Sequence, residues 1–281
     1  MKPKFYNKVC AGICLAIVVL VSSHSTLAQS TLVTVTENPD QVNSSLSNTD
    51  VFTFDNLSLG YNNNVRWNNV GTFDQLYVLR PSQWGGAPDA SSPNGTNYSV
   101  QGVGKLAKTT LSLDTPSSYF GLWWSAGDSS NLLRFYNSDT LLAEFRTNTL
   151  TGLLPKDYYG NPINRKKASH EPFAFVNFYG DEETQWDRIE FTNATRSGFE
   201  SDNYTSRVYT YDPNTDGEAN VGNVVAEVSG NETTEVSEVP TDWSWGSGGA
   251  APGAPAPPVF LAAAFAVVVF LKNKFKRDQK N

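Results

Sequence analysis

The chain has 281 residues and carries 21 basic and 28 acidic side chains, a net charge of −7. Residues 1–28 hold three basic residues, and five basic and one acidic residue follow Leu271, which leaves 13 basic and 27 acidic residues between them, a net charge of −14. Such a body repels nucleic acid and anionic lipid, which excludes nucleic-acid binding, and it suits cations or neutral sugars. Both cysteines, Cys10 and Cys14, lie before residue 29, so the rest depends on a hydrophobic core instead of disulfides.

Residues 1–28 have the pattern of a secretory signal peptide. A cationic start precedes the apolar stretch Val9–Val21, and the small residue Ala28 stands where signal peptidase needs one. The pattern predicts cleavage between Ala28 and Gln29. The alternative, an uncleaved N-terminal anchor, is disfavoured because the apolar stretch is short for a membrane span.

A single β domain is expected to follow. Residues 29–50 are mostly polar and predict a flexible start, whereas residues 51–211 show apolar residues with period two between Gly, Asn, Asp and Pro. No stretch has sustained helical periodicity. Strands are expected at Lys108–Leu113, Tyr119–Ser125, Asn131–Tyr136, Thr140–Thr147, Phe173–Tyr179, Trp186–Phe191 and Tyr204–Tyr211. The pattern predicts an all-β fold, an antiparallel β-sandwich of jelly-roll type.

Two adjacent tryptophans should point to opposite faces of the strand at Tyr119–Ser125. Trp124 shares its face with Phe120 and Leu122, which predicts a place in the core. Trp123 is predicted at the surface, where its indole could stack on a sugar ring and contact a glycan. The alternative is that loops cover both faces of the strand and bury both indoles.

Three blocks of the sequence follow one another in the expected domain: Tyr119–Tyr136, Glu171–Phe178 and Gly198–Asn203. Together they resemble the exosortase-dependent surface proteins of cyanobacteria, and the resemblance extends over about Thr96–Tyr211. It implies export, recognition of a C-terminal sorting segment by the membrane protease exosortase, and release or transfer to the surface matrix. The Pro-Glu-Pro sorting motif of PEP-CTERM tails is absent. A variant motif stands in its place, with Pro252, Gly253, Pro255, Pro257 and Pro258.

The C-terminal part has the order of a sorting tail. Residues 212–258 are rich in Gly, Pro, Ser and Glu and predict a disordered stalk. Val259–Leu271 is apolar and predicts a transmembrane sorting segment, and residues 272–281 predict a basic cytoplasmic tail. The expected stop-transfer residues are Lys272, Lys274, Lys276, Arg277 and Lys280.

That sorting segment is expected to anchor the precursor only transiently. Its 13 residues fall short of the roughly 20 that span a bilayer comfortably. One alternative is a permanent membrane anchor that is never processed. A eukaryotic lipid anchor is a second alternative, but its signal should end in apolar residues, and this tail is basic.

Catalytic chemistry has few candidates in this sequence. His170 is the sole histidine after residue 28, and no Gly-x-Ser-x-Gly motif is present, so we expect a solvated loop histidine and no catalytic residue. Glu200 and Asp202 should share one face of a strand. Together with Asn203 they suit a structural Ca²⁺ site. The alternatives are ordinary turn hydrogen bonding, which is favoured, and a catalytic acid pair.

The sequence therefore predicts a non-enzymatic, exported protein of the cell surface or extracellular matrix with a membrane-anchored precursor. Its expected partners are an exosortase-type sorting enzyme, the membrane during sorting, and extracellular polysaccharide or biofilm matrix bound by a lectin-like β-sandwich. A secreted glycan-active enzyme that uses paired carboxylates is the rival from another class.

Overall fold

The computed structural model describes residues 32–38, 40–90, 92, 94–181, 183–207 and 223–229. The predicted signal peptide with Ala28 and Gln29, the sorting motif, the transmembrane segment and the basic tail lie outside these residues. Within them, no helix is long and apolar enough to cross a membrane.

The described residues form thirteen strands and three short 3₁₀ helices. The strands are β1 (Leu32–Glu37), β2 (Asp50–Phe52), β3 (Gly60–Trp67), β4 (Gly71–Leu79), β5 (Tyr98–Gly102), β6 (Lys108–Ser117), β7 (Tyr119–Ser125), β8 (Leu132–Asn137), β9 (Thr140–Arg146), β10 (Ala174–Gly180), β11 (Trp186–Thr192), β12 (Gly198–Arg207) and β13 (Asn223–Ser229). The helices are η1 (Thr147–Thr149), η2 (Thr151–Leu153) and η3 (Lys156–Tyr158). The predicted all-β class is confirmed.

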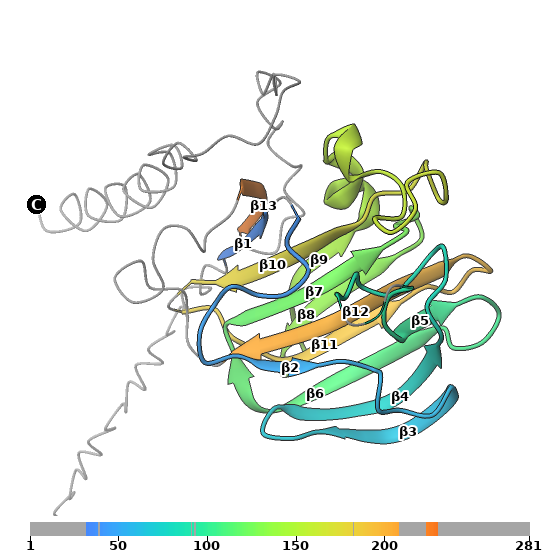
Figure 1. The fold of residues 1–281 in the computed structure, drawn as a ribbon. Coiled ribbons are helices and arrows are strands. Elements are labelled where there is room, and N and C mark those ends of the chain that lie inside the picture. Colours follow the sequence, from blue (N-terminus) through green and yellow to red (C-terminus); the bar gives the residue numbers. More distant parts are fainter. Residues whose placement is uncertain are drawn as a thin grey trace, which may run out of the picture.

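All strands belong to one antiparallel sheet, which folds over into two facing layers (Figure 1). Its strand order is β13-β1-β10-β7-β12-β5-β4-β6-β11-β8-β9, with β2 beside β12 and β3 beside β4. Strand β4 makes the corner. Phe73, near its start, is paired with Leu111 of β6, whereas Val78, near its end, is paired with Ser99 of β5. The front layer therefore runs from β13 to β5, and the back layer from β6 to β9.

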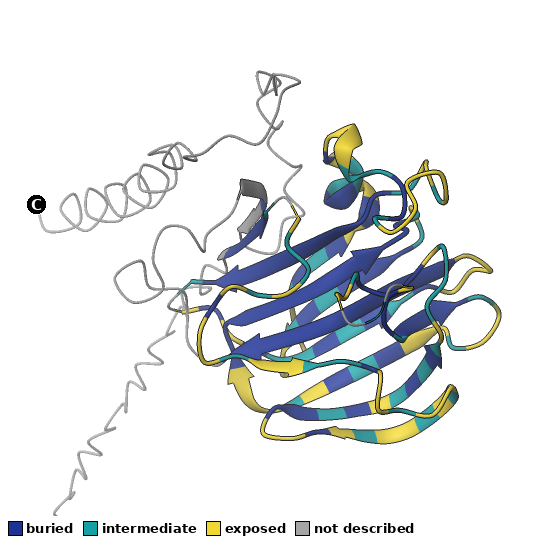
Figure 2. Cartoon of the chain, viewed as in Figure 1, coloured by how far each residue is buried: buried dark blue, intermediate teal, exposed yellow. Residues whose placement is uncertain are grey.

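Aromatic side chains join the two layers across the core. Phe191 of β11 in the back layer stacks on Tyr204 of β12 in the front layer, with ring centroids 4.7 Å apart and planes 6° apart. Phe120 of β7 packs edge-on against both rings. Figure 2 shows that β5, β7, β10 and β12 of the front layer are buried throughout, whereas burial alternates along β3, β4 and β6. These four front strands are therefore covered on both of their faces.

Two strands lie outside the predicted limits of the domain, residues 51–211. Strand β1 lies within the expected flexible start, and its Val33 and Val35 are fully buried in the core. Strand β13 lies within the predicted disordered stalk and pairs with β1 along its whole length. The expected flexible start is wrong for β1, because alternating valines in Leu32–Glu37 supply core side chains despite the polar surroundings. The expected disorder is wrong for Asn223–Ser229, because pairing with β1 holds this segment in the sheet.

Five loops gather at one end of the two layers, which we call the loop end: residues 80–97, 103–107, 126–131, 147–173 and 193–197. Hydrogen bonds link them in a series, through the pairs Val103–Ser197, Asn193–Asn131, Gly127–Pro172 and Asn161–Ser82. The loop end is thus a single hydrogen-bonded unit.

The opposite end is where the chain enters and leaves the described domain. Leu32 at the start of β1 is paired with Ser229 at the end of β13, and Val33 is paired with Gly180 at the end of β10. Because β10 begins beside Trp124 at the loop end and finishes beside β1, residues 32 and 229 lie at the far end of the sheet from the five loops.

Candidate functional site

Glu200 and Asp202 share one face of β12, as predicted. Their cross-strand neighbours on β7 are Ser125 and Trp123, and this face points away from the core. Both side chains are nevertheless buried, with exposed fractions of 6% for Glu200 and 0% for Asp202.

The carboxylate of Asp202 fixes the loop 80–97 to the sheet. Its Oδ2 accepts hydrogen bonds from the Ala87 backbone N–H at 3.0 Å and from the Thr96 hydroxyl at 2.5 Å. Its Oδ1 accepts the Asn203 backbone N–H at 2.7 Å. Burial raises the pKa of Asp202 to about 7, although these donors favour the charged form.

Asn203 lies at a bulge in β12, where the register against β7 shifts between Asp202 and Thr205. Its φ of +48° is in the left-handed region that Asn tolerates better than most residues. The side-chain amide turns toward the loop 38–49 and donates to the Val42 carbonyl at 2.9 Å. The bulge therefore directs Asn203 and Asp202 to different loops.

Glu200 has a different environment, near the loop end. Its carboxylate folds back over Gly198, so that a Cβ atom at that position would clash with it. Burial raises its pKa to about 8, helped by the negative charges of Glu171 and Asp128 and opposed by a hydrogen bond from its own N–H. Glu200 is therefore largely protonated at neutral pH.

The predicted calcium site is not assembled from these three residues. Asp202 is occupied by hydrogen-bond donors, Asn203 contacts Val42, and Glu200 lies over Gly198. In the described part of the chain, no three His, Cys, Asp or Glu side chains lie close enough to hold a metal ion. Stabilisation by calcium stays a prediction. The hydrogen bonding of Asp202 corresponds to the favoured alternative, an ordinary structural role.

Asp202→Ala should loosen the loop 80–97 without unfolding the domain. A hydrogen bond to a charged group contributes about 1.5–3 kcal/mol, so we expect the Ala87 amide to exchange its hydrogen about tenfold to a hundredfold faster. Hydrogen exchange followed by mass spectrometry measures this. The control is Asp74→Ala, which removes an exposed acceptor of the Thr110 N–H. Unchanged exchange at Ala87 would contradict the assigned role.

Both tryptophans are buried, although their side chains lie on opposite faces of β7. Trp124 is fully buried and stacks on Phe199 with ring centroids 4.6 Å apart, which confirms its place in the core. Trp123 is only 4% exposed and packs with Phe173, Phe175 and Ala87. Its predicted surface position is wrong, because residues of the loops 80–97 and 147–173 cover it. The alternative, in which loops cover both faces of the strand and bury both indoles, is confirmed. An indole buried in this way offers no exposed platform for a glycan.

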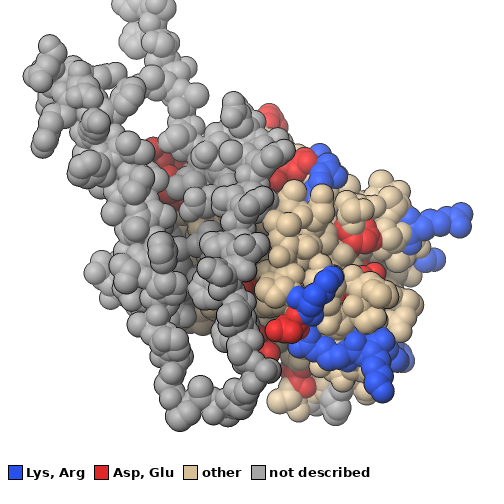
Figure 3. All heavy atoms as spheres, turned by 90° about the horizontal axis from the view of Figure 1, so that it is seen from above, with Lys and Arg blue, Asp and Glu red and all other residues tan. Residues whose placement is uncertain are grey.

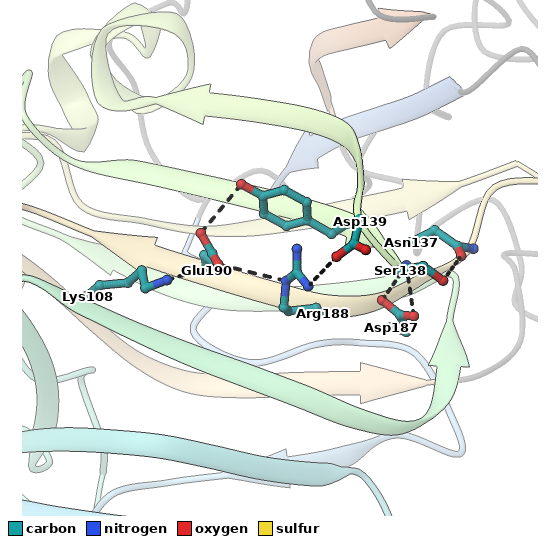
Figure 4. Close-up of polar contacts among 8 residues, drawn as sticks. Lys108, Asn137, Ser138, Asp139, Asp187, Arg188 and Glu190 are labelled. Atoms are coloured by element: carbon teal, nitrogen blue, oxygen red, sulfur yellow. Dashed lines mark hydrogen bonds and ion pairs between the residues drawn. The ribbon is translucent and has the colours of Figure 1, made fainter.

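Charged side chains on the outward face of the back layer pair with one another (Figure 4). Lys108 Nζ lies 3.1 Å from Glu190 Oε1, and Arg188 reaches Glu190 at 3.8 Å and Asp139 at 3.9 Å. The Arg188 guanidinium also lies over the Tyr136 ring, 4.3 Å from its centroid. The strand cations that form such ion pairs are Arg66, Lys108, Arg134, Arg146 and Arg188.

Cations at the loop end have no such partners. Seven of them are exposed there: Arg80, Lys105, Lys156, Arg165, Lys166, Lys167 and Arg196. Among the described residues, none of the seven forms an ion pair with a carboxylate. On the face seen in Figure 3, Lys and Arg side chains gather toward the right, where the loop end lies in Figure 1. In the sequence this patch is indicated by three consecutive basic residues, Arg165–Lys167. The negative net charge of the body gives no indication of such a local cluster.

Two loops of the loop end are held together by Asn161, which is 3% exposed. Its side-chain amide donates to the carbonyls of Ser82 and Gln83, at 3.3 and 3.2 Å. The loop with the densest cations therefore lies against the loop that carries Trp84, whose side chain is 48% exposed. Trp84 is therefore a far more accessible indole than Trp123, the predicted glycan contact. His170 is exposed in the same loop end, as predicted for a solvated residue.

Comparisons of the chain with protein-family models, with curated proteins and with solved structures find no match. The described residues form an all-β, sandwich-like domain whose loop end carries seven exposed cations.

Proposed function

We propose that the chain is an exported, non-enzymatic cell-surface protein. A β-sandwich of jelly-roll type attaches it to extracellular polysaccharide, and an exosortase-type enzyme processes its membrane-anchored precursor. The observation that carries the proposal is the order of segments in the sequence. Before the domain come a basic start, an apolar stretch and a small residue, in the order of a signal peptide. After it come a Pro/Ala-rich segment, an apolar stretch and a basic end, in the order of a sorting tail.

The burial of the two acids supports a non-enzymatic role. A glycosidase needs two carboxyl groups that flank the bond of a bound sugar. Glu200 and Asp202 are covered by loops, and the hydrogen bonds of Asp202 go to the protein itself. Their raised pKa values have an ordinary cause in burial.

The course of the chain supports display of the domain away from an anchor. The described strands end at Ser229, at the end opposite the five loops, and the predicted sorting tail follows in sequence. A domain tethered through that tail would present its loop end outward.

Processing at both ends is the prediction that tests this function. Intact-mass measurement of the protein released from the surface of its own cells should give a chain that starts near Gln29 and lacks Lys272–Asn281. A surface form that keeps both segments would contradict processing and favour a permanent anchor.

A variant tail provides the control for this measurement. Replacing the five basic residues after Leu271 with serine removes side chains that are strongly disfavoured in the bilayer. The tail of this variant should therefore be translocated completely across the membrane. We expect an unprocessed, secreted chain. Normal processing of this variant would show that the basic residues are not needed as a stop signal.

A further inference from the structure

We propose that the loop end binds an anionic polysaccharide, one that carries carboxylate or sulfate groups. This inference rests on the proposed attachment to extracellular polysaccharide and specifies the charge of that polymer. It departs from the expectation of neutral sugars, which followed from the net charge of the whole body.

Basic residues are concentrated in the five loops of the loop end. The five loops of the loop end hold seven basic and four acidic residues, whereas the rest of residues 32–207 holds six basic and 15 acidic residues. The segment 208–258 adds eight acidic residues and no basic one. Carboxylates of neighbouring segments also reach the loop end, because Asp55 accepts the Asn97 backbone N–H and Glu37 accepts the Tyr158 hydroxyl. Basic residues are nevertheless denser in these five loops than in the rest of the domain.

The unpaired state of the cations leaves them available to a ligand. Five cations on the strands already have carboxylate partners, as in the pair of Lys108 with Glu190. At the loop end, Lys156 lies over the Tyr159 ring, 3.8 Å from its centroid, and makes no ion pair with a carboxylate among the described residues. Lys166 and Lys167 are exposed and equally without an acidic partner in that part of the chain. An anionic ligand would therefore gain ion pairs without breaking existing ones.

The backbone under these cations is held in a defined conformation. Asn161 donates its backbone N–H to the Lys167 carbonyl at 2.9 Å and accepts the N–H groups of Ile163 and Asn164 at its Oδ1. The guanidinium of Arg165 donates to the backbone carbonyls of Asp157 and Tyr159. A turn fixed at both ends loses less entropy on binding than a free loop would.

The neighbouring apolar groups suit a sugar. Trp84 is 48% exposed and Ile163 is 42% exposed, and hydrogen bonds from Asn161 join their two loops. An indole can cover the C–H face of a sugar ring, while lysines pair with its acidic groups. Duplex nucleic acid, with one charge per roughly 1.7 Å, would meet stronger repulsion from the acidic remainder of the chain. The combination of spaced cations and an indole therefore favours a polymer of acidic sugars.

The test uses the full chain and three probes: alginate, dextran sulfate and uncharged dextran. We expect alginate and dextran sulfate to bind at 50 mM NaCl and to weaken strongly at 300 mM, and dextran not to bind. The double variant Lys166→Ser, Lys167→Ser should bind alginate about tenfold more weakly. Trp84→Ala should weaken alginate binding while leaving its salt dependence unchanged.

The matched control changes the net charge by the same amount away from the loop end. Asn68→Asp combined with Gln185→Glu adds two negative charges at exposed positions between strands and should leave alginate binding within about twofold of the original. Equal losses in both double variants would overturn the proposal, because long-range charge would then explain the binding.

Other ligands give the remaining outcomes. Tighter binding to duplex DNA or to phosphatidylglycerol vesicles than to alginate would also overturn the inference, as would equal binding to uncharged dextran. Polysaccharide binding is measured on purified protein and does not depend on how the tail is cut. Failure of this inference and failure of the proposed processing are therefore seen in different experiments.

Discussion

Trp124→Ala should lower the free energy of unfolding by about 3–5 kcal/mol, the usual cost of truncating a fully buried aromatic side chain. The indole is wholly inaccessible to solvent and stacks on Phe199. Its removal would therefore leave a cavity lined by apolar side chains, which water does not fill favourably. Urea unfolding of the variant, followed by intrinsic fluorescence, measures the loss. A loss below about 1 kcal/mol would contradict the described packing.

Trp123→Ala is the informative companion, because the two residues are neighbours on opposite faces of β7. With Trp123 only 4% exposed among Phe173, Phe175 and Ala87, we expect a loss of the same order. If Trp123→Ala left the free energy of unfolding nearly unchanged, the covering loops would open readily in solution. The Trp123 indole would then be accessible to a ligand.

Stability should fall as the pH rises from about 4.5 to about 8. Glu200 has a pKa of about 8 in the folded chain, against an ordinary value of 4.5, and Asp202 has one of about 7, against 3.8. Below the ordinary values both states hold the protons. Between the ordinary and the raised values the unfolded chain releases protons that the folded chain retains, so the free energy of unfolding decreases with pH. Above about 8 the loss is complete.

Glu200→Gln isolates this effect from the other acidic groups. An uncharged amide of similar shape removes the titration, and the variant should lose less stability between pH 5 and pH 8.5, by on the order of 3 kcal/mol. In a domain of this size that corresponds to a difference of roughly 10 °C in the shift of the melting temperature. Parallel stability curves for the two proteins would contradict a buried, protonated Glu200.

Period two in the sequence was sufficient to predict the fold class and several strands. The stretch Tyr119–Ser125 has the same limits as β7, and the hairpin around Asn137, Ser138 and Asp139 joins β8 to β9. Strand β1 was missed because its alternating valines stand among polar residues, which lowers the apolar content of the segment. Alternation within a strand was the better indicator there than composition.

The candidate site was less predictable, for reasons that lie in the tertiary structure. Alternation shows that Trp123 faces away from the core, but it gives no information about the loops that cover this face. Glu200 and Asp202 were correctly placed on one face. The bulge at Asn203, which directs Asp202 and Asn203 to different loops, has no clear sequence signal. Net charge likewise conceals where Lys166 and Lys167 lie relative to the acidic residues.

The pairing of β1 with β13 has a mechanical consequence. If polysaccharide holds the loop end and the tail tethers the chain beyond Ser229, tension acts along the strands, with its two points of attachment at opposite ends of the domain. The hydrogen bonds that join β13 to β1 over Leu32–Glu37 then carry the load together in shear. Had the chain left from the loop end, the same bonds would open one after another, as in a zipper. This strand arrangement would therefore resist detachment by flow or by movement of neighbouring cells.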